Sequence, residues 1–597
     1  MATYQAPLKF MRFLLHEVFK TEEMLQKQNA LEDFNAELMD AILDEASNFA
    51  QQVLFPINRN GDEQGCQFDN GVVTTPDGFK EAYQQFMDGG WAVMGCSEEF
   101  GGQPLPKSLH LMIEEIFYAC NTSFGLYPNL TNTAIHLLEH HANETLKQTY
   151  LPKMVSGQWA GTMCLTESHA GSDLGIIKSR ATEQDDGSYL ISGTKIFISA
   201  GETDLTENII HLVLAKLPGA PEGSKGISLF LVPKFLPDES NNPGERNAVH
   251  CGAIEHKMGI KGSATCVMNF DDAKGYLVGE INAGLKCMFT MMNNERLSVG
   301  MQGVGNAEVA LQSATEYALD RKQGRKPGSK DVADPIIGHA DVRRMLLTIM
   351  GMNGGCRALT ALAGNMYDTS IYHQDAEERE KSARMLALVT PVCKAFFTDQ
   401  AFISCNLGLQ VFGGHGYVRE WGIEQLVRDV RITQLYEGTN GIQSMDLIGR
   451  KVLGDGGIAW QEFKAELSTM IKDAEQVNIL GKDCTRVRQA MSNLSSVTDS
   501  LLENAKRNID IQGSVATEYM NLFGTVTLGC LWLKMAAVAI NSDAEDDVFH
   551  SQIQSVCAFY CRHQLASVST SVERIMAGAK TIISPDISEF ELTTLVN

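Results

Sequence analysis

The sequence lacks the features that would place the chain in a membrane, in a secretory pathway or on nucleic acid. No uninterrupted apolar run approaches the ~20 residues needed to cross a bilayer. The first 20 residues mix acidic and basic side chains among apolar ones, without a signal-peptide core or the acid-poor bias of a transit peptide. Basic residues are scarce, 49 against 73 acidic, and the net charge of -24 disfavours a nucleic-acid partner. We therefore expect a cytoplasmic protein with no transmembrane segment.

Cysteine pairs with the spacing of metal ligands are also missing. The 14 cysteines are dispersed without a CxxC motif, and Cys557 and Cys561, one helical turn apart, have no histidine pattern beside them. Reduced, buried thiols are the expected state. No metal site is predicted.

The chain is long enough for several hydrophobic cores. Its 597 residues exceed a single domain, and the apolar period changes from helical to alternating and back to helical. We predict a mostly α-helical protein with a central β domain of barrel or sandwich type. The predicted parts are an N-terminal helical extension (1–34), an N-terminal helical domain (35–160), a middle β domain (161–280), a four-helix-bundle domain (281–451) and an additional helical domain (452–597).

Local signals predict where the elements begin and end. A helix starts after Asn35 and ends near Pro56, and a loop follows over 60–75. Asp186-Gly187 predicts a hairpin turn before a strand over 189–199. The last domain, with 18 acidic against 11 basic residues, reads as helical over 460–476, 485–509, 514–540 and 549–581. It carries no catalytic constellation, so packing and assembly are its expected roles.

Two segments combine small residues with side chains that can do chemistry. Residues 429–443 end an apolar run with Glu437 directly before Gly438, an arrangement that in an arbitrary chain is usually a helix end with a solvated charge. Residues 163–173 run from a strand end into a loop with hydroxyls at Thr166 and Ser172. Such a loop lets backbone amides approach a planar, hydrogen-bonding ligand.

The two segments together resemble those of a known family. Tyr-Glu-Gly-Thr-x-x-Ile-Gln at 436–443 resembles the catalytic-base segment of the acyl-CoA dehydrogenases, and Thr-Glu-x-x-Ala-Gly-Ser-Asp at 166–173 resembles their flavin-binding signature. The resemblance covers about residues 35–450 in order and spacing. The opening helix and the long tail resemble a bacterial subgroup of about 600 residues that includes 3-methylmercaptopropionyl-CoA dehydrogenase-like and fatty acyl-CoA dehydrogenases.

The resemblance implies FAD as cofactor, acyl-CoA as substrate and Glu437 as the base that removes the α-proton. The implied FAD-binding residues are Met163, Leu165, Thr166, Phe197, Ser199, Thr439 and Gly441, together with Arg321, Gln410, Gly413 and Gly414, of which Arg321 and the glycine turn meet the FAD of a neighbouring subunit. The implied substrate-binding residues are Ser172, Asn293, Arg296 and Gly438. Two departures stand out: Phe197-Ile-Ser199 replaces the common Trp-Ile-Thr, and the Phe-Gly order after Arg321 is lost.

Some family members supply the base from the helix that contains Arg296 instead. The resemblance places that position at Met291, which cannot accept a proton. The base therefore falls to Glu437.

The implied reaction is α,β-dehydrogenation of acyl-CoA thioesters to trans-2-enoyl-CoA, in fatty acid β-oxidation or 3-methylmercaptopropionyl-CoA oxidation. Electrons would pass to electron-transfer flavoprotein, and the extra helical domain implies a homodimer. Three alternatives stay open: an acyl-CoA oxidase, a DNA-associated acyl-CoA dehydrogenase relative, which the acidic tail disfavours, and a catalytically silent FAD-binding scaffold. No single residue sets the acyl chain length.

Overall fold

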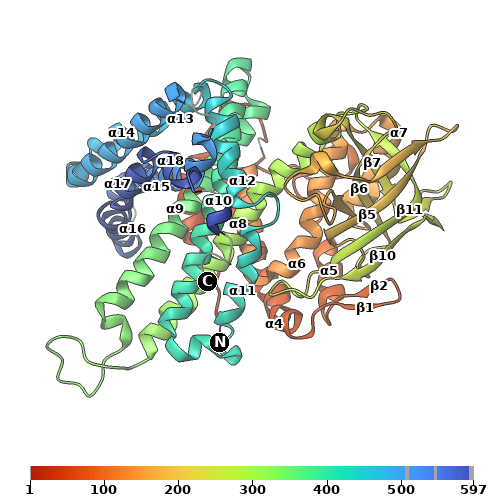
Figure 1. The fold of residues 1–597 in the computed structure, drawn as a ribbon. Helices are drawn as coiled ribbons and strands as arrows, with labels where there is room; N and C mark the ends of the chain where they lie inside the picture. The colour runs from red at the N-terminus through yellow and green to blue at the C-terminus, as the bar shows by residue number, and fades with distance from the viewer. Residues whose placement is uncertain (1, 32, 505–509, 543–546, 586, 591–597) are drawn as a thin grey trace.

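The computed structural model describes residues 2–31, 33–504, 510–542, 547–585 and 587–590. Helices before and after a single β domain make up most of the chain, and Figure 1 shows the β domain standing beside the helices. The predicted fold class, mostly α with a central β domain, is confirmed.

The N-terminal part is helical apart from one small hairpin. Its elements are α1 (Leu8–Arg12), the π-helical turn η1 (Phe13–Val18), α2 (Thr21–Lys27), α3 (Ala36–Phe49), η2 (Ala50–Leu54), α4 (Phe55–Gln64), β1 (Gln67–Asp69), β2 (Val72–Thr74), α5 (Phe79–Asp88), α6 (Lys107–His141) and α7 (Glu144–Val155). Asn35 caps α3 as predicted, because its side chain accepts from the Leu38 amide at 2.9 Å. The predicted helix end at Pro56 is wrong. Pro56 lies in the first turn of α4, where its missing N–H costs no hydrogen bond.

The β domain is a closed ring of strands with two additions. Its strands are β3 (Trp159–Cys164), β4 (Arg180–Glu183), β5 (Tyr189–Ser199), β6 (Asn208–Lys216), β7 (Ile227–Pro233), β10 (Val249–Ile254) and β11 (Thr265–Val278), with a separate pair β8 (Phe235–Pro237) and β9 (Pro243–Arg246). Pairing runs β11-β5-β4-β6-β7 and returns to β11, while β3 joins β6 in parallel and β10 joins β11. A ring that closes on itself is a barrel, one of the two predicted types.

The bundle that follows consists of α8 (Gly284–Asp320), α9 (Ala340–Tyr372), α10 (Ala376–Val411) and α11 (Ile423–Arg431), and α6 packs along α8. A buried ion network ties three of these helices together. Arg357 of α9 donates to Glu115 of α6 at 2.5 Å and to Glu308 of α8 at 2.8 Å. After α11 come the short helix η9 (Ile432–Gln434), α12 (Asn440–Met445) and η10 (Asp446–Leu453).

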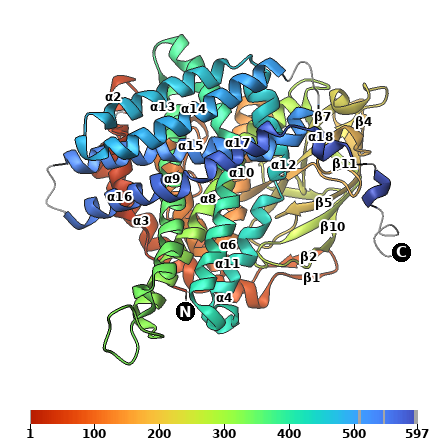
Figure 2. The ribbon, with the colours of Figure 1, turned by 60° about the vertical axis from the view of Figure 1, so that its left-hand side comes forward.

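The tail packs its helices on the bundle, as Figure 2 shows. They are α13 (Ile458–Glu475), α14 (Gly481–Asn504), α15 (Ile511–Asn541), α16 (Asp547–Phe559), α17 (Ser567–Met576) and α18 (Lys580–Ile583). The indole N–H of Trp532 in α15 donates to the Gly351 carbonyl of α9 at 2.8 Å. The predicted helix over 549–581 is broken after Phe559 and again before Ser567. The predicted helix end at 505–509 lies outside the described residues.

Two helices in the described part of the chain, α10 and α15, are long and apolar enough to cross a membrane by length and composition alone. However, 67% and 83% of their most apolar windows are buried inside the protein. Burial against other helices is what a core helix shows. The expectation of no transmembrane segment stays a prediction.

Candidate active site

The chain turns sharply between η9 and α12, at Glu437 and Gly438. Their φ angles are 57° and 82°, in the left-handed region that a glutamate rarely adopts. A Cβ on Gly438 would lie 2.6 Å from Nε2 of Gln443, so the position has no room for a side chain. That same Nε2 donates to the Glu437 carbonyl at 3.0 Å, and Thr439 caps α12. The turn is therefore held from the helix that follows it.

Glu437 carries a free carboxyl oxygen at this turn. The side chain is half-buried, and Oε2 is shielded from solvent and has no hydrogen-bond partner among the described residues. Burial raises the pKa of Glu437 to about 7, although Arg296 and Lys394 both act to lower it. A carboxylate that ionises near neutral pH and has an open oxygen can accept a proton.

Two buried cations lie close to Glu437. Arg296 of α8 is 4% exposed, donates to Asn293 Oδ1 at 3.2 Å and lies 3.6 Å from a carboxyl oxygen of Asp446. Lys394 of α10 is fully buried, and sequence reasoning missed it. Burial lowers the pKa of Lys394 to about 7, against the opposing charge of Glu437.

Sequence reasoning also missed a second carboxyl group, Glu295. It is 2% exposed and accepts from Nδ2 of Asn129 at 2.6 Å. Burial, followed by the charge of Glu437, raises the pKa of Glu295 well above its usual range. Met291, the position implied by the resemblance, is a buried thioether one helical turn before this acid. The sequence signal for this second acid was its position directly before the predicted substrate-binding residue Arg296.

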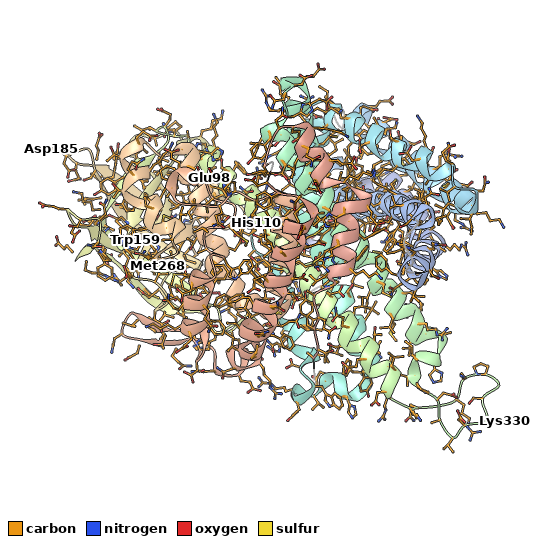
Figure 3. The ribbon with its side chains drawn as sticks, turned by 180° about the vertical axis from the view of Figure 1, so that it is seen from behind. Glu98, His110, Trp159, Asp185, Met268 and Lys330 are labelled. Atoms are coloured by element: carbon orange, nitrogen blue, oxygen red, sulfur yellow. The ribbon has the colours of Figure 1, made fainter. Side chains whose placement is uncertain are left out.

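A cavity of about 40 Å³ lies on the α6 side of this region, and Asn129 connects it with Glu295. Its polar lining includes His110, Glu114 and Tyr118; Figure 3 shows His110 between the β domain and the bundle. Glu114 Oε2 and Asn129 Oδ1 are buried without a partner among the described residues. The volume and the unpartnered polar atoms suit one or two bound water molecules.

The two flavin-type segments of the β domain lie side by side. The Ile196 amide donates to the Thr166 carbonyl at 2.9 Å, and Lys195 Nζ donates to the Leu165 carbonyl at 3.0 Å. Phe197 is 60% exposed with φ 59°, at an irregularity in the β5–β11 pairing. An exposed aromatic residue in a strained conformation at a bulge is typical of a ligand-binding surface. Met163, Thr166 and Ser199 are half-buried, Leu165 is buried, and Ser172 is exposed in the adjoining loop.

A loop of the β domain is fixed to the helix that leads into the base turn. The Ile260 amide donates to Asp429 Oδ1 at 2.5 Å, and Arg428 donates to the Met258 carbonyl at 3.1 Å. Because α11 ends three residues later and η9 continues it, these bonds couple the flavin-type domain to the segment that carries Glu437.

A second group of predicted residues lies on the surface. Arg321, Gln410, Gly413 and Gly414 are all exposed, at the end of α8 and in the turn after α10. Tyr317 links the two elements, since its hydroxyl lies 3.0 Å from His415 Nδ1. A Cβ on Gly413 or Gly414 would meet nothing within 4 Å, so their backbone is open to an approaching group. No direct hydrogen bond or ion pair between described residues joins this group to the turn at Glu437.

These observations test whether the site suits a flavin. The β5 surface offers an exposed aromatic plane at Phe197 and half-buried hydroxyls at Thr166 and Ser199. Near the base turn, Arg296 Nε, Gln302 Nε2 and Gln443 Oε1 are buried without partners in the described part of the chain. Because buried polar atoms are nearly always hydrogen-bonded, this concentration of unpartnered atoms fits a polar ligand. The residues present therefore fit a flavin.

The fold and the site together define a protein with a β-barrel between two helical parts, with a buried carboxyl group and a surface that fits a flavin. Family models match almost the whole chain: the N-terminal domain (37–158), the middle domain (162–273) and the C-terminal domain (282–453) of acyl-CoA dehydrogenases, and the acetyl-CoA dehydrogenase C-terminal-like domain (463–586). The chain belongs to the acyl-CoA dehydrogenase family, FAD-dependent oxidoreductases that act on acyl-CoA.

Individual relatives match over nearly their full length. The chain is 40% identical to 3-methylmercaptopropionyl-CoA dehydrogenase of Ruegeria pomeroyi over 93% of this chain and 97% of the relative. It is 33% identical to a butyryl-CoA dehydrogenase of Syntrophomonas wolfei, covering 95% and 94%. Among solved structures, Caenorhabditis elegans ACDH-11 in complex with C11-CoA shares the fold with a TM-score of 0.76 at 20% identity, covering 94% and 92%.

Proposed function

We propose that the chain oxidises acyl-CoA thioesters to trans-2-enoyl-CoA with FAD as cofactor and Glu437 as base. The observation that carries the proposal is the free, buried oxygen of Glu437, held in a strained turn beside two cations. The raised pKa of Glu295, caused by burial and by the charge of Glu437, disfavours Glu295 as the ionised base and supports Glu437.

In the reaction, the α-carbon of the thioester loses a proton and the bond electrons stay with carbon. Glu437 Oε2 receives that proton. The Glu437 amide donates to no group in the described part of the chain, so it is available to the thioester carbonyl, where negative charge develops. Bound FAD supplies the acceptor for the hydride that leaves the β-carbon.

The chain's own residues divide between cofactor and substrate. Met163, Leu165, Thr166, Phe197 and Ser199 would hold FAD from the β domain, with Thr439 and Gly441 on the base side. Ser172, Asn293, Arg296 and Gly438 would bind the acyl-CoA.

The exposed residues Arg321, Gln410, Gly413 and Gly414 suit the FAD of a second subunit, which supports a homodimer. Electron-transfer flavoprotein is the proposed acceptor. The cytoplasmic location stays a prediction.

The experiment that tests the reaction is anaerobic titration of the yellow holoenzyme with a panel of acyl-CoAs. 3-(Methylthio)propanoyl-CoA and butanoyl-CoA come first, because relatives of matching length are named for those substrates. Rapid bleaching of the flavin by one member identifies the substrate class. Absence of bleaching by every member would leave only a silent scaffold.

The remaining alternatives are distinguished by peroxide formation in air and by DNA binding at increasing salt concentration. An oxidase would form one equivalent of peroxide per turnover, whereas a dehydrogenase needs an added electron acceptor. A DNA-associated relative would bind DNA with an affinity that falls steeply with salt.

A further inference from the structure

Lys394 is a buried ammonium group without a carboxylate partner. Its side chain is 0% exposed, and no ion pair within 4.0 Å reaches it from the described residues. Its Nζ donates instead to the Gly438 carbonyl at 2.8 Å and to the Asn440 side-chain oxygen at 2.7 Å. A buried charge with only neutral acceptors is costly, so its place beside the base turn calls for an explanation.

The bond to Gly438 completes the support of the base turn. The two consecutive left-handed residues expose two carbonyl groups, and each is held by a side chain from a different helix. Gln443 of α12 holds the Glu437 carbonyl at 3.0 Å, and Lys394 of α10 holds the next one. Strained backbone persists only where its surroundings fix it. Removing either donor frees one side of the turn.

Asn440 is itself fixed so that its oxygen faces Lys394. Its Nδ2 donates to Asp399 Oδ1 at 2.7 Å and to Thr398 Oγ1 at 2.9 Å. Gln434, which precedes the turn, donates to the same Asp399 oxygen at 2.6 Å. Thus the stretch of α10 from Lys394 to Asp399 holds the base segment by hydrogen bonds on both sides of Glu437.

The charged groups around this turn come from every element packed against it. From α8 come Arg296 and Glu295, whose pKa is raised by burial and by the charge of Glu437; from α10 come Lys394 and Asp399, and from η10 comes Asp446, which pairs with Arg296. Asp399 is engaged by two amides and Asp446 by arginine. Lys394 and Arg296 are therefore the cations that act on Glu437.

We propose that Lys394 is a positioning residue for the base: it fixes the turn through the Gly438 carbonyl and supplies a positive charge that favours the carboxylate form of Glu437. The proposal rests on Glu437 being the base. Because the hydrogen bonds of Lys394 go to the Gly438 carbonyl and the Asn440 side chain, it acts on the base through the turn.

The charge role has a defined sign. Burial raises the pKa of Glu437 to about 7 and lowers the pKa of Lys394 to about 7, so the ammonium and the carboxylate coexist around neutral pH. Removing the ammonium raises the pKa of Glu437. The rate of proton abstraction then rises with pH later than in the wild type, and each unit of displacement lowers the rate at pH 6.5 about tenfold.

The test compares the rate of anaerobic flavin bleaching by 3-(methylthio)propanoyl-CoA and butanoyl-CoA from about pH 5.5 to 9. Lys394→Gln keeps a donor and loses the charge, and Lys394→Arg keeps the charge. Lys464→Met is the matched control, because Lys464 is a half-buried tail lysine that donates to a neutral hydroxyl, Ser495, at 2.6 Å. The pH at which the rate rises to half its maximum is expected to be about one unit higher in Lys394→Gln, no higher in Lys394→Arg, and unchanged in Lys464→Met.

Hydrogen exchange tests the positioning role without catalysis. Amides of the peptide 436–443 are expected to exchange faster in Asn440→Ala and Lys394→Gln than in the wild type and in Lys464→Met. Asn440→Ala is expected to lower the bleaching rate at every pH without changing the pH at which that rate rises. If Lys394→Gln fails to fold, Lys394→Arg decides the charge role: a rise of the rate displaced to higher pH in this variant overturns it.

Other outcomes overturn the proposal separately from the proposed function. If flavin-loaded Lys394→Gln shows the same pH dependence of bleaching as the wild type, the charge role is wrong. If the amides of 436–443 exchange at the wild-type rate in both Lys394→Gln and Asn440→Ala, the positioning role is wrong. Full bleaching activity of Glu437→Gln in the same assay would instead show that the proposed base is wrong.

Discussion

Replacing each of the two buried carboxyls by an amide of the same shape decides which of them is the base. At pH 8 about nine-tenths of Glu437 is ionised, given its pKa of about 7. Glu437→Gln removes the proposed base, and a positioned general base typically contributes ~10²–10⁴-fold. The bleaching rate is therefore expected to fall by about that factor, while flavin and acyl-CoA still bind.

Glu295→Gln is expected to behave differently. Burial and the charge of Glu437 raise the pKa of Glu295 well above the usual range, which favours its protonated form. The introduced amide oxygen can still accept from Asn129, so the change exchanges one neutral acceptor for another. We expect a rate within about threefold of the wild type, which is under ~1 kcal/mol.

The assay is stopped-flow bleaching of flavin by the substrate that the acyl-CoA panel identifies. Glu518→Gln serves as control, because Glu518 is a half-buried acid of the tail that pairs with Arg574 at 2.8 Å. A Glu437→Gln enzyme that keeps more than about a tenth of the rate would refute the reasoning. So would a Glu295→Gln enzyme that loses as much as Glu437→Gln.

Three further predictions follow from the site and the bundle. The bleaching rate of the wild type rises with pH through about 7, because the pKa of Glu437 is about 7 and only its carboxylate accepts a proton; a flat profile between about pH 6 and 8 would contradict this. Gly438→Ala places a Cβ 2.6 Å from Gln443 Nε2 at φ 82°, so it is expected to lower the rate more than tenfold with little change in Tm, measured by stopped flow and calorimetry. Arg357→Met leaves two buried carboxyls without their cation and is expected to cost about 3–5 kcal/mol of unfolding free energy, measured by urea titration; a loss below about 1 kcal/mol would contradict it.

Local signals in the sequence were sufficient for features that depend on neighbouring residues. Asn35 caps its helix because a side-chain oxygen three residues before a free amide is enough for a cap. Pro56 misled for the same local reason: a proline usually ends a helix, but here the preceding residues form a π-helical turn and a new helix begins around it. The alternation of β5 predicted a strand, though not the left-handed φ of Phe197, which arises from its pairing with β11.

Parts of the site that form between distant segments could not be predicted from the sequence. Lys394 lies 43 residues before Glu437 on a helix whose apolar pattern marks it only as core, and its bonds to the base turn exist only after α10 and α12 pack together. Glu295 is next to a predicted residue, yet its burial depends on Asn129 of α6. The resemblance supplied Glu437 through its motif. The ionisation of that residue is controlled by tertiary contacts, which the motif does not show.

The reactivity of the base follows from a balance of charges within a strongly acidic protein. Burial alone would leave Glu437 protonated at neutral pH and unable to accept a proton. Two unopposed cations would lower its pKa and weaken it as a base. The structure lies between these extremes, because the effect of Arg296 is reduced by its own partner Asp446 and Lys394 is partly neutral near pH 7. Proton abstraction at neutral pH therefore depends on the two cations opposing the effect of burial on Glu437.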